Sequence, residues 1–228
     1  MTNESKLAEL NEEIIQCRKC LRLVQWREEV ARVKRKAYRD QEYWGRAVPG
    51  FGDPQARVLV VGLAPGAHGS NRTGRVFTGD ASGGFLFPAL YRAGFANQPL
   101  AESRSDGLRL IDLYIVAVAH CVPPANKPVP EELDNCQPYL ERTLEILKPK
   151  VIVCLGRIAF ERVLRILRIY SVRNSAWMFG HGAFYQLDDG TWILCSYHPS
   201  QQNTQTGRLT AAMFDQIWAK AKELLRDE

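Results

Sequence analysis

The chain of 228 residues is 46% hydrophobic, which suffices for one large α/β domain or two small ones. It has no apolar run near the ~20 residues of a membrane-spanning helix, and its start, MTNESKLAEL, lacks a signal-peptide pattern. Both features predict a soluble, cytoplasmic protein. The formal net charge of +5 is uneven, because residues 18–39 carry nine Lys or Arg against Glu28 and Glu29, a net of +7.

This basic segment, residues 18–39, is accompanied by the aromatic residues Trp26, Tyr38, Tyr43 and Trp44. Positive charge beside aromatic rings is typical of a surface that binds a phosphate backbone. The competing interpretation is a solvated helix face, since basic runs are common on protein surfaces.

Hydrophobic patterns predict helices and strands in alternation along the chain. Leu7, Leu10 and Ile14 have helical spacing and predict a helix over residues 5–16, followed by basic helix or coil. Continuous apolar runs predict four buried strands, at 57–63, 113–119, 151–155 and 192–197. Between and after them, helices are predicted at 84–92, 130–148 (kinked by Pro138), 157–169 and 213–225. The segment VPGFGDP at 48–54 is turn-forming.

This alternation of strands and helices, without long linkers or repeats, predicts one α/β domain over residues 1–228. Its expected architecture is a three-layer αβα sandwich around a central four-stranded parallel sheet. Three polar loops, 62–83, 120–130 and 198–207, each follow a predicted strand. Since parallel strands end at the same edge of a sheet, these loops are expected to converge on one site.

The first of these loops is unusually long and polar, which is typical of a functional connection. It offers Arg72, Arg75, the aromatic ring of Phe77 and the carboxylate of Asp80. It contains neither a Walker P-loop nor a G-x-G-x-x-G motif, which disfavours nucleotide sites of those types. Two alternatives stay open: Phe77 could plug the core, and Asp80 could be a helix N-cap.

The six cysteines divide into two groups. Cys154 and Cys195 lie in predicted strands, where a free cysteine packs as a small hydrophobe. The remaining four can form one metal site: Cys17, Cys20, Cys121 and Cys136. Zinc and a [4Fe–4S] cluster both accept four thiolates, and spacing alone does not separate them. The alternative is that the cysteines are structural and bind no metal.

Three stretches carry a family resemblance: GLAPGAHGSNRTGRVFTGDASG, CVPPANKP with the four spaced cysteines, and YHPSQQNTQTGRLT. They resemble the family-five (type-b) uracil-DNA glycosylases. The resemblance implies a monofunctional enzyme that removes uracil and other deaminated bases from double- and single-stranded DNA, with water as the acceptor. It also implies a [4Fe–4S] cluster on the four cysteines. We expect a monomer.

The resemblance also implies roles for individual residues. Asp80 is the expected catalytic carboxylate, orienting water or stabilising the sugar cation, and His198 is expected to donate a hydrogen bond to the leaving base. The expected base-binding residues are Gly62, Ala64, His68, Phe77 and Asn126. The expected DNA-binding residues are Arg72, Arg75, Lys127, Ser200 and Gln201.

Two departures from related glycosylases bear on selectivity. Leu63 and Ala64 are apolar where many glycosylases of this fold place a polar side chain. The second strand has Val116-Ala117-Val118 where other branches use an Asn. Strict selectivity for uracil is therefore not expected. A nucleotide-binding transferase and a non-enzymatic iron–sulfur DNA-binding protein are the competing functions.

Overall fold

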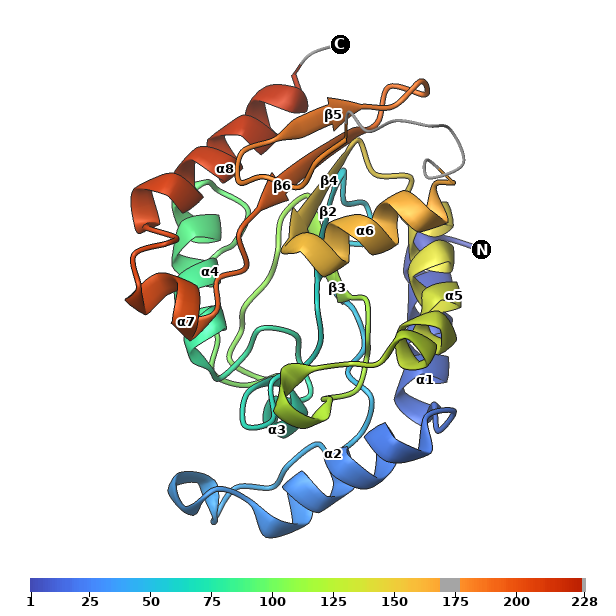
Figure 1. The fold of residues 1–228 in the computed structure, drawn as a ribbon, viewed down its shortest axis with the longest axis vertical. Coiled ribbons are helices and arrows are strands. Elements are labelled where there is room, and N and C mark those ends of the chain that lie inside the picture. Colours follow the sequence, from blue (N-terminus) through green and yellow to red (C-terminus); the bar gives the residue numbers. More distant parts are fainter. Residues whose placement is uncertain (169–176, 227–228) are drawn as a thin grey trace.

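The computed structural model, which describes residues 1–168 and 177–226, is built on one six-stranded sheet of order β1-β3-β2-β4-β6-β5 (Figure 1). Its four central strands are parallel: β3 (Leu113–Ala117), β2 (Val58–Gly62), β4 (Val151–Leu155) and β6 (Trp192–Ser196). All four are buried apart from Trp192, as continuous apolar runs require. The predicted parallel sheet and its strand positions are confirmed to within one or two residues.

The sheet has two antiparallel edge strands that the sequence did not reveal. β1 (Phe51–Gly52) pairs with β3, and β5 (Phe184–Gln186) pairs with β6. The expected count of four strands was therefore too low. β1 lies inside the turn-forming VPGFGDP segment, and β5 is short and partly exposed, so neither shows a buried apolar run.

Helices cover both faces of the sheet, which confirms the three-layer αβα expectation (Figure 1). α4 (Ala81–Arg92) and α8 (Ala211–Leu224) pack on one face around the largest apolar cluster. α1 (Asn3–Gln16), α5 (Pro130–Leu147) and α6 (Arg157–Ile166) cover the other. α6 ends at Ile166, three residues before the predicted end at residue 169. Residue 169 itself lies outside the described residues.

Shorter helices lie in polar stretches, where no apolar pattern in the sequence predicted them. α2 (Leu21–Val33) resolves the basic stretch as a helix, and α3 (Ser70–Thr73) and α7 (Gln201–Gln205) lie in two of the site loops. Two 3₁₀ turns follow Arg35 and Pro123, at Lys36–Tyr38 and Pro124–Asn126. Within the described ranges, no helix is long and apolar enough to cross a membrane.

The parallel strands bring their following loops to one edge, as expected. The loop after β3 continues beside the loop after β2, because the Val118 and Ala119 N–H groups donate to the Gly62 and Leu63 carbonyls. β4 and β6 are joined beyond their ends by the Gly156 N–H, which donates to the Ser196 carbonyl.

We expect Trp218→Ala to lower the free energy of unfolding by about 3–5 kcal/mol, because it empties a fully buried site where α8 meets the sheet. Trp218 contacts the rings of Phe95 and Phe214. Its indole N–H has no hydrogen-bond partner within the described residues. Trp218→Phe keeps most ring contacts and removes that N–H, so its cost should be much smaller. Chemical denaturation measures both; equal losses would contradict the assignment.

Candidate active site

A cavity of about 590 Å³ opens at the carboxyl ends of the central strands. It is lined by residues from all three predicted site loops, so the convergence expected from topology is confirmed. Eight of the predicted site residues line it: Ala64, Phe77, Asp80, Asn126, Lys127, His198, Ser200 and Gln201. A volume of this order suits a small planar ligand with part of its attached backbone.

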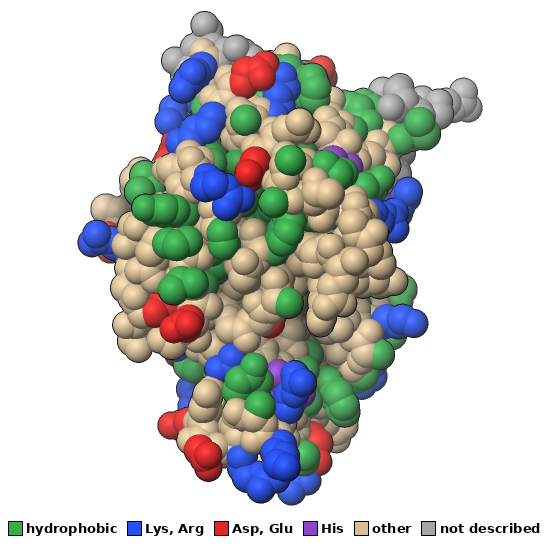
Figure 2. Space-filling view, turned by 90° about the vertical axis from the view of Figure 1, so that its left-hand side faces the viewer, with side chains coloured by type: hydrophobic (Ala, Val, Ile, Leu, Met, Phe, Trp, Pro, Cys, Tyr) green, Lys and Arg blue, Asp and Glu red, His purple; other side chains and the backbone are tan. Residues whose placement is uncertain are grey.

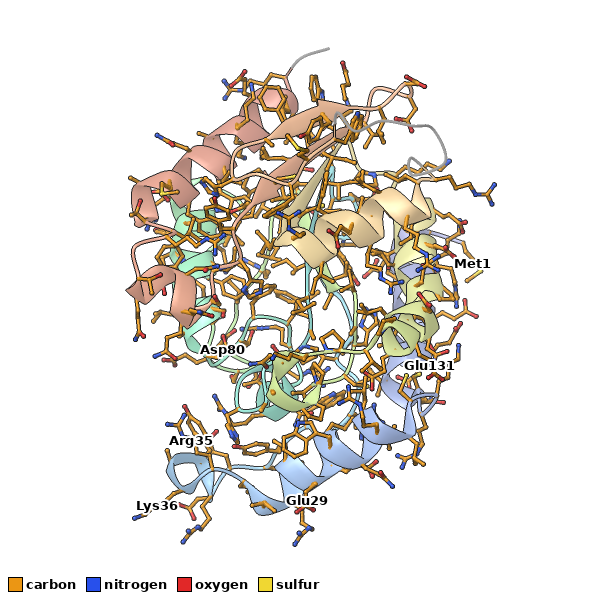
Figure 3. All side chains as sticks on the ribbon, viewed as in Figure 1. Met1, Glu29, Arg35, Lys36, Asp80 and Glu131 are labelled. Atoms are coloured by element: carbon orange, nitrogen blue, oxygen red, sulfur yellow. The ribbon has the colours of Figure 1, made fainter. Side chains whose placement is uncertain are left out.

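Asp80 is both a helix N-cap and a residue of the cavity lining, two positions that the sequence analysis treated as alternatives. It is the N-cap of α4, because one carboxylate oxygen accepts the Gly83 N–H at 3.1 Å. The same side chain lines the cavity (Figure 3). Burial raises the pKa of Asp80 above its ordinary value, while the Gly83 and Ser82 N–H groups and the charge of Arg72 act in the opposite direction. The result is a half-buried carboxylate held in a fixed orientation.

Two glycines that were not predicted as site residues make room for this carboxylate. A Cβ on Gly69 would lie 2.0 Å from Asp80 Oδ2, and a Cβ on Gly66 would lie 2.8 Å from the same atom. Any side chain at Gly69 would therefore displace the carboxylate. The available signal was the pair of glycines in the loop that precedes Asp80.

Phe77 forms one wall of the cavity and is held in a strained conformation. Its φ of 51° is unusual for a bulky residue, and such outliers cluster at functional sites. The ring lies over Gly62, where a Cβ would approach it to 2.9 Å. Gly83 permits the turn, because a Cβ there would lie 1.7 Å from the Phe77 carbonyl oxygen. Gly62 thus acts behind the cavity wall and does not line it.

His198 follows β6 and faces the same cavity. Its ring lies 5.7 Å from the Phe77 ring, centroid to centroid, at an angle of 32°. Burial lowers the pKa of His198 to about 4, so the imidazole is neutral near pH 7. Its backbone carbonyl accepts the Asn203 side-chain amide at 2.8 Å, which ties the turn to α7. A neutral imidazole, with one N–H donor and one acceptor nitrogen, therefore lines the cavity.

The loop after β3 brings Asn126 and Lys127 to the rim. Asn126 is exposed and has a left-handed φ of 56°, which Asn tolerates better than most residues. Its neighbour Ala125 shares that conformation, with a φ of 53°. Asn126 thus fits its turn and also lines the cavity. Across the rim, Ser200 caps α7 through the Asn203 N–H, and Gln201 is exposed.

Besides Gly62, three predicted base- or DNA-binding residues lie outside the cavity lining: His68, Arg72 and Arg75. His68 pairs with the Tyr43 hydroxyl at 3.0 Å, and burial lowers its pKa. Arg72 lies over the Tyr38 ring at 4.1 Å and donates to the carbonyls of His68 and Gly79.

Arg75, the third, is buried and forms a two-pronged ion pair with Asp106 at 2.6 and 2.8 Å. The pair holds the pKa of Asp106 far below its usual range, although burial alone would raise it. Arg75 is therefore occupied in fixing the loop and is not presented to a DNA phosphate.

The basic segment is less uniform than its sequence suggested. Arg18, Arg22 and Arg32 are paired with Glu28, Glu132 and Glu29. The exposed positive charge gathers instead at Arg35, Lys36 and Arg39. Figure 2 shows Lys and Arg side chains gathered at the lower end of one face, and Figure 3 places Arg35 and Lys36 at that end, below Asp80.

The four separately spaced cysteines meet between the N-terminal helices and the start of α5. Cys17, Cys20 and Cys121 share an apolar cluster with Tyr139, and all are free thiols. Burial, with a smaller contribution from the other thiols, raises the pKa of Cys121 to about 11 and that of Cys136 to about 12, while the Arg27 guanidinium acts against the shift at Cys121. In the described part of the chain, no three His, Cys, Asp or Glu side chains surround a single point as one metal ion requires.

Arg27, which sequence reasoning missed, provides a test of what fits between these thiols. It is 2% exposed, and its guanidinium donates to Cys121 Sγ at 2.9 Å. Its Nε is without a hydrogen-bond partner among the described residues. A buried cation requires nearby negative charge, which four metal-bound thiolates supply and four neutral thiols do not. The residues present therefore fit an anionic metal–thiolate group.

Residues 49–222 match the family described as the uracil DNA glycosylase superfamily. The chain is 54% identical over 209 residues to the Type-5 uracil-DNA glycosylase of Thermus thermophilus, covering 91% of this chain and 93% of that protein. It is 50% identical over 220 residues to the Type-5 uracil-DNA glycosylase of Mycobacterium leprae, covering 96% and 95%. A Type-4 uracil-DNA glycosylase of Archaeoglobus fulgidus is 35% identical over 159 residues, covering 67% and 70%. The chain belongs to the uracil DNA glycosylase superfamily.

Proposed function

We propose that this protein hydrolyses the N-glycosidic bond of uracil, and of other deaminated bases, in DNA. The observation that carries the proposal is the pairing of a held carboxylate, Asp80, with a neutral imidazole, His198, on one cavity. The base enters after it is extruded from the helix, because the bond cannot be reached in the stack. The product is an abasic site, with water as the acceptor.

The two side chains act on opposite ends of the breaking bond. His198, being neutral, donates an N–H to the base oxygen as negative charge develops there. Asp80 stabilises the cationic sugar or orients the attacking water, and its contact with Gly83 fixes the direction in which it points. Phe77 stacks on the base, a contact worth ~1–3 kcal/mol in other base–aromatic pairs. Asn126 reads the base edge from the rim.

The competing functions fit this cavity less well. A nucleotide-binding transferase would need a phosphate cradle or metal carboxylates, and Asp80 is the sole carboxylate among the described lining residues. A protein that only binds DNA gains nothing from a half-buried carboxylate facing its anionic ligand. The apolar wall at Leu63 and Ala64 also admits more than one base, which supports a range wider than uracil.

The cofactor we propose is a [4Fe–4S] cluster on Cys17, Cys20, Cys121 and Cys136. An [4Fe–4S] group accepts four thiolates on separate irons and supplies structural cross-linking and negative charge. The donor set is all sulfur, and the buried Arg27 guanidinium lies against one of the thiols. A cluster held by these cysteines would join α2 to the loop before α5.

For DNA, we propose that Arg35, Lys36 and Arg39 contact phosphates together with Lys127, Ser200 and Gln201 at the rim. The first three are exposed, and Figure 3 shows Arg35 and Lys36 at the end of the molecule below Asp80. These contacts are sequence-independent and suit both double- and single-stranded DNA. We further propose that the enzyme works as a cytoplasmic monomer.

The function is tested by single-turnover cleavage of duplexes containing uracil or hypoxanthine. We expect Asp80→Asn to slow both substrates by a similar factor, because the sugar is common to them. His198→Ala should slow cleavage about 10²–10³-fold, as losing one such donor does elsewhere. Its effect should be largest for the poorer leaving group.

Two controls belong to this experiment. Binding to an abasic-site duplex should survive both substitutions, because phosphate contacts supply most of that affinity. Borohydride should trap no covalent adduct, because water is the acceptor. Full activity in Asp80→Asn would reduce Asp80 to a helix cap, and a trapped adduct would replace hydrolysis with amine chemistry.

The rate should fall at acid pH with an apparent pKa above that of an ordinary aspartate. Burial raises the pKa of Asp80, and the active form is the carboxylate, so activity is lost as pH falls through this raised pKa. The pKa of His198 is lowered to about 4, and its imidazole donates an N–H in either protonation state, so we assign the limb to Asp80. Single-turnover rates from about pH 4 to pH 8 measure this. The limb should persist in His198→Ala and disappear in Asp80→Asn; the reverse pattern would exchange the two assignments.

Replacing Arg35 and Lys36 together by Gln should weaken binding to all duplexes alike. Each lost phosphate contact should flatten the plot of log affinity against log salt by about 0.9. The charge-matched control replaces Lys6 and Lys148, which are exposed on α1 and at the end of α5. Fluorescence anisotropy over a salt series measures both. An unchanged slope in the first variant would make these residues part of a solvated surface.

A further inference from the structure

Arg27 is a charged residue on the buried face of α2. α2 buries one stripe of its surface, formed by Leu23, Val24, Arg27 and Val30. Arg27 is one of the largest fully buried side chains of the described structure. No ion pair among the described residues involves it, whereas Arg22 and Arg32 on the same helix each have a glutamate.

The contacts of this guanidinium point to the cysteines. Nη1 donates to Cys121 Sγ at 2.9 Å and Nη2 donates to the Cys17 carbonyl at 3.1 Å, while Nε has no partner in the described part. Leaving a cation buried without a counter-charge is strongly destabilising. The one carboxylate that acts on Arg27 among the described residues, Glu28, is ion-paired with Arg18 and makes no hydrogen bond to the Arg27 guanidinium. Thiolates bound to a metal would supply negative charge on the side of the guanidinium that faces Cys121, and N–H donors to such sulfurs strengthen and tune the group.

The backbone of Arg27 is connected by hydrogen bonds to the loop that carries Asp80. The Arg27 carbonyl accepts the Asn71 side-chain amide at 3.2 Å, and Asn71 is fully buried. The Asn71 N–H in turn donates to the Gly66 carbonyl at 3.0 Å. Gly66 is one of the two glycines against which the Asp80 carboxylate lies. A displacement of α2 at Arg27 would therefore shift this loop as well.

We propose that Arg27 is the counter-cation of a metal–thiolate group on the four cysteines and the positioning residue that ties this group to the Asp80 loop. The inference rests on the proposed function only in requiring that the cysteines hold a metal. On this proposal, the hydrogen bond from Arg27 to Cys121 makes the packing of α2 depend on whether the cysteines hold a metal.

The first experiment measures iron and zinc content, then the rate of metal release to a chelator, for the full-length loaded protein. Arg27→Met fills the same space without charge and should release metal at least about tenfold faster, since a charge-assisted hydrogen bond is lost. Arg32→Met is the matched control on the exposed side of α2 and should release metal as the wild type does. Arg27→Lys keeps the charge with fewer donors and should fall between them.

The second experiment separates a link to the metal from a merely structural role. Arg27→Met should lower the melting temperature of the loaded protein and raise that of the metal-free protein, because only the former supplies negative charge. Equal shifts in the two forms would overturn the proposal. Amide exchange over residues 66–80 should accelerate in loaded Arg27→Met and not in Arg32→Met; an unchanged rate would overturn the tie to the loop.

These outcomes are distinct from failure of the proposed function. Zinc in place of iron would overturn the [4Fe–4S] assignment, and the Arg27 comparison would then be decided on zinc release. Absence of any bound metal in the freshly purified protein would overturn both. Inactivity on uracil-containing DNA would overturn the glycosylase proposal while leaving the metal-release comparison intact.

Discussion

The site depends above all on how one carboxylate is held. Asp80 begins α4 by accepting the Gly83 N–H, and Gly66 and Gly69 leave just enough space beside it. The helix terminus favours the ionised form while burial disfavours it, and burial prevails in the net shift of its pKa. A cap of this kind cannot rotate away without opening the first turn of α4. The same contact that starts the helix therefore keeps the proposed catalytic carboxylate in place.

On the other side of the cavity, the polar group is a neutral imidazole rather than a carboxylate. His198 is placed where burial removes its charge, so it acts as a neutral donor. A cationic imidazole would attract the DNA backbone indiscriminately, whereas a neutral one responds to charge that develops on the base. Phe77 accepts backbone strain to present its ring beside His198. The strain is tolerated because Gly62 and Gly83 remove the side chains that would clash.

Sequence was sufficient for the central strands because each is a continuous apolar run at a buried position, as in Val151–Leu155. It was insufficient for β5, whose residues are half exposed and whose pairing depends on the neighbouring strand. The cavity residues followed from topology, since strand ends converge whatever the loops contain. Arg75 was misjudged because a sequence does not show that Asp106 lies opposite. Burial of Arg27 was readable only from its place on the apolar stripe of α2.

The two chemical centres are joined by short-range contacts rather than by a shared surface. Three of the four cysteines lie in or at the ends of α1, α2 and α5, whereas the cavity is lined by residues of α4 and α7. Figure 1 shows α1 and α5 on one side of the molecule and α4 and α7 on the other. Between them, Asn71 bridges α2 and the loop with two hydrogen bonds, and a fully buried amide of this kind is costly to misplace. The basic turn at Lys36–Tyr38 begins only three residues after α2 ends, at Val33. Fixing α2 at the cysteines would therefore also fix the back of the Asp80 loop and the start of the exposed basic turn that we propose contacts DNA.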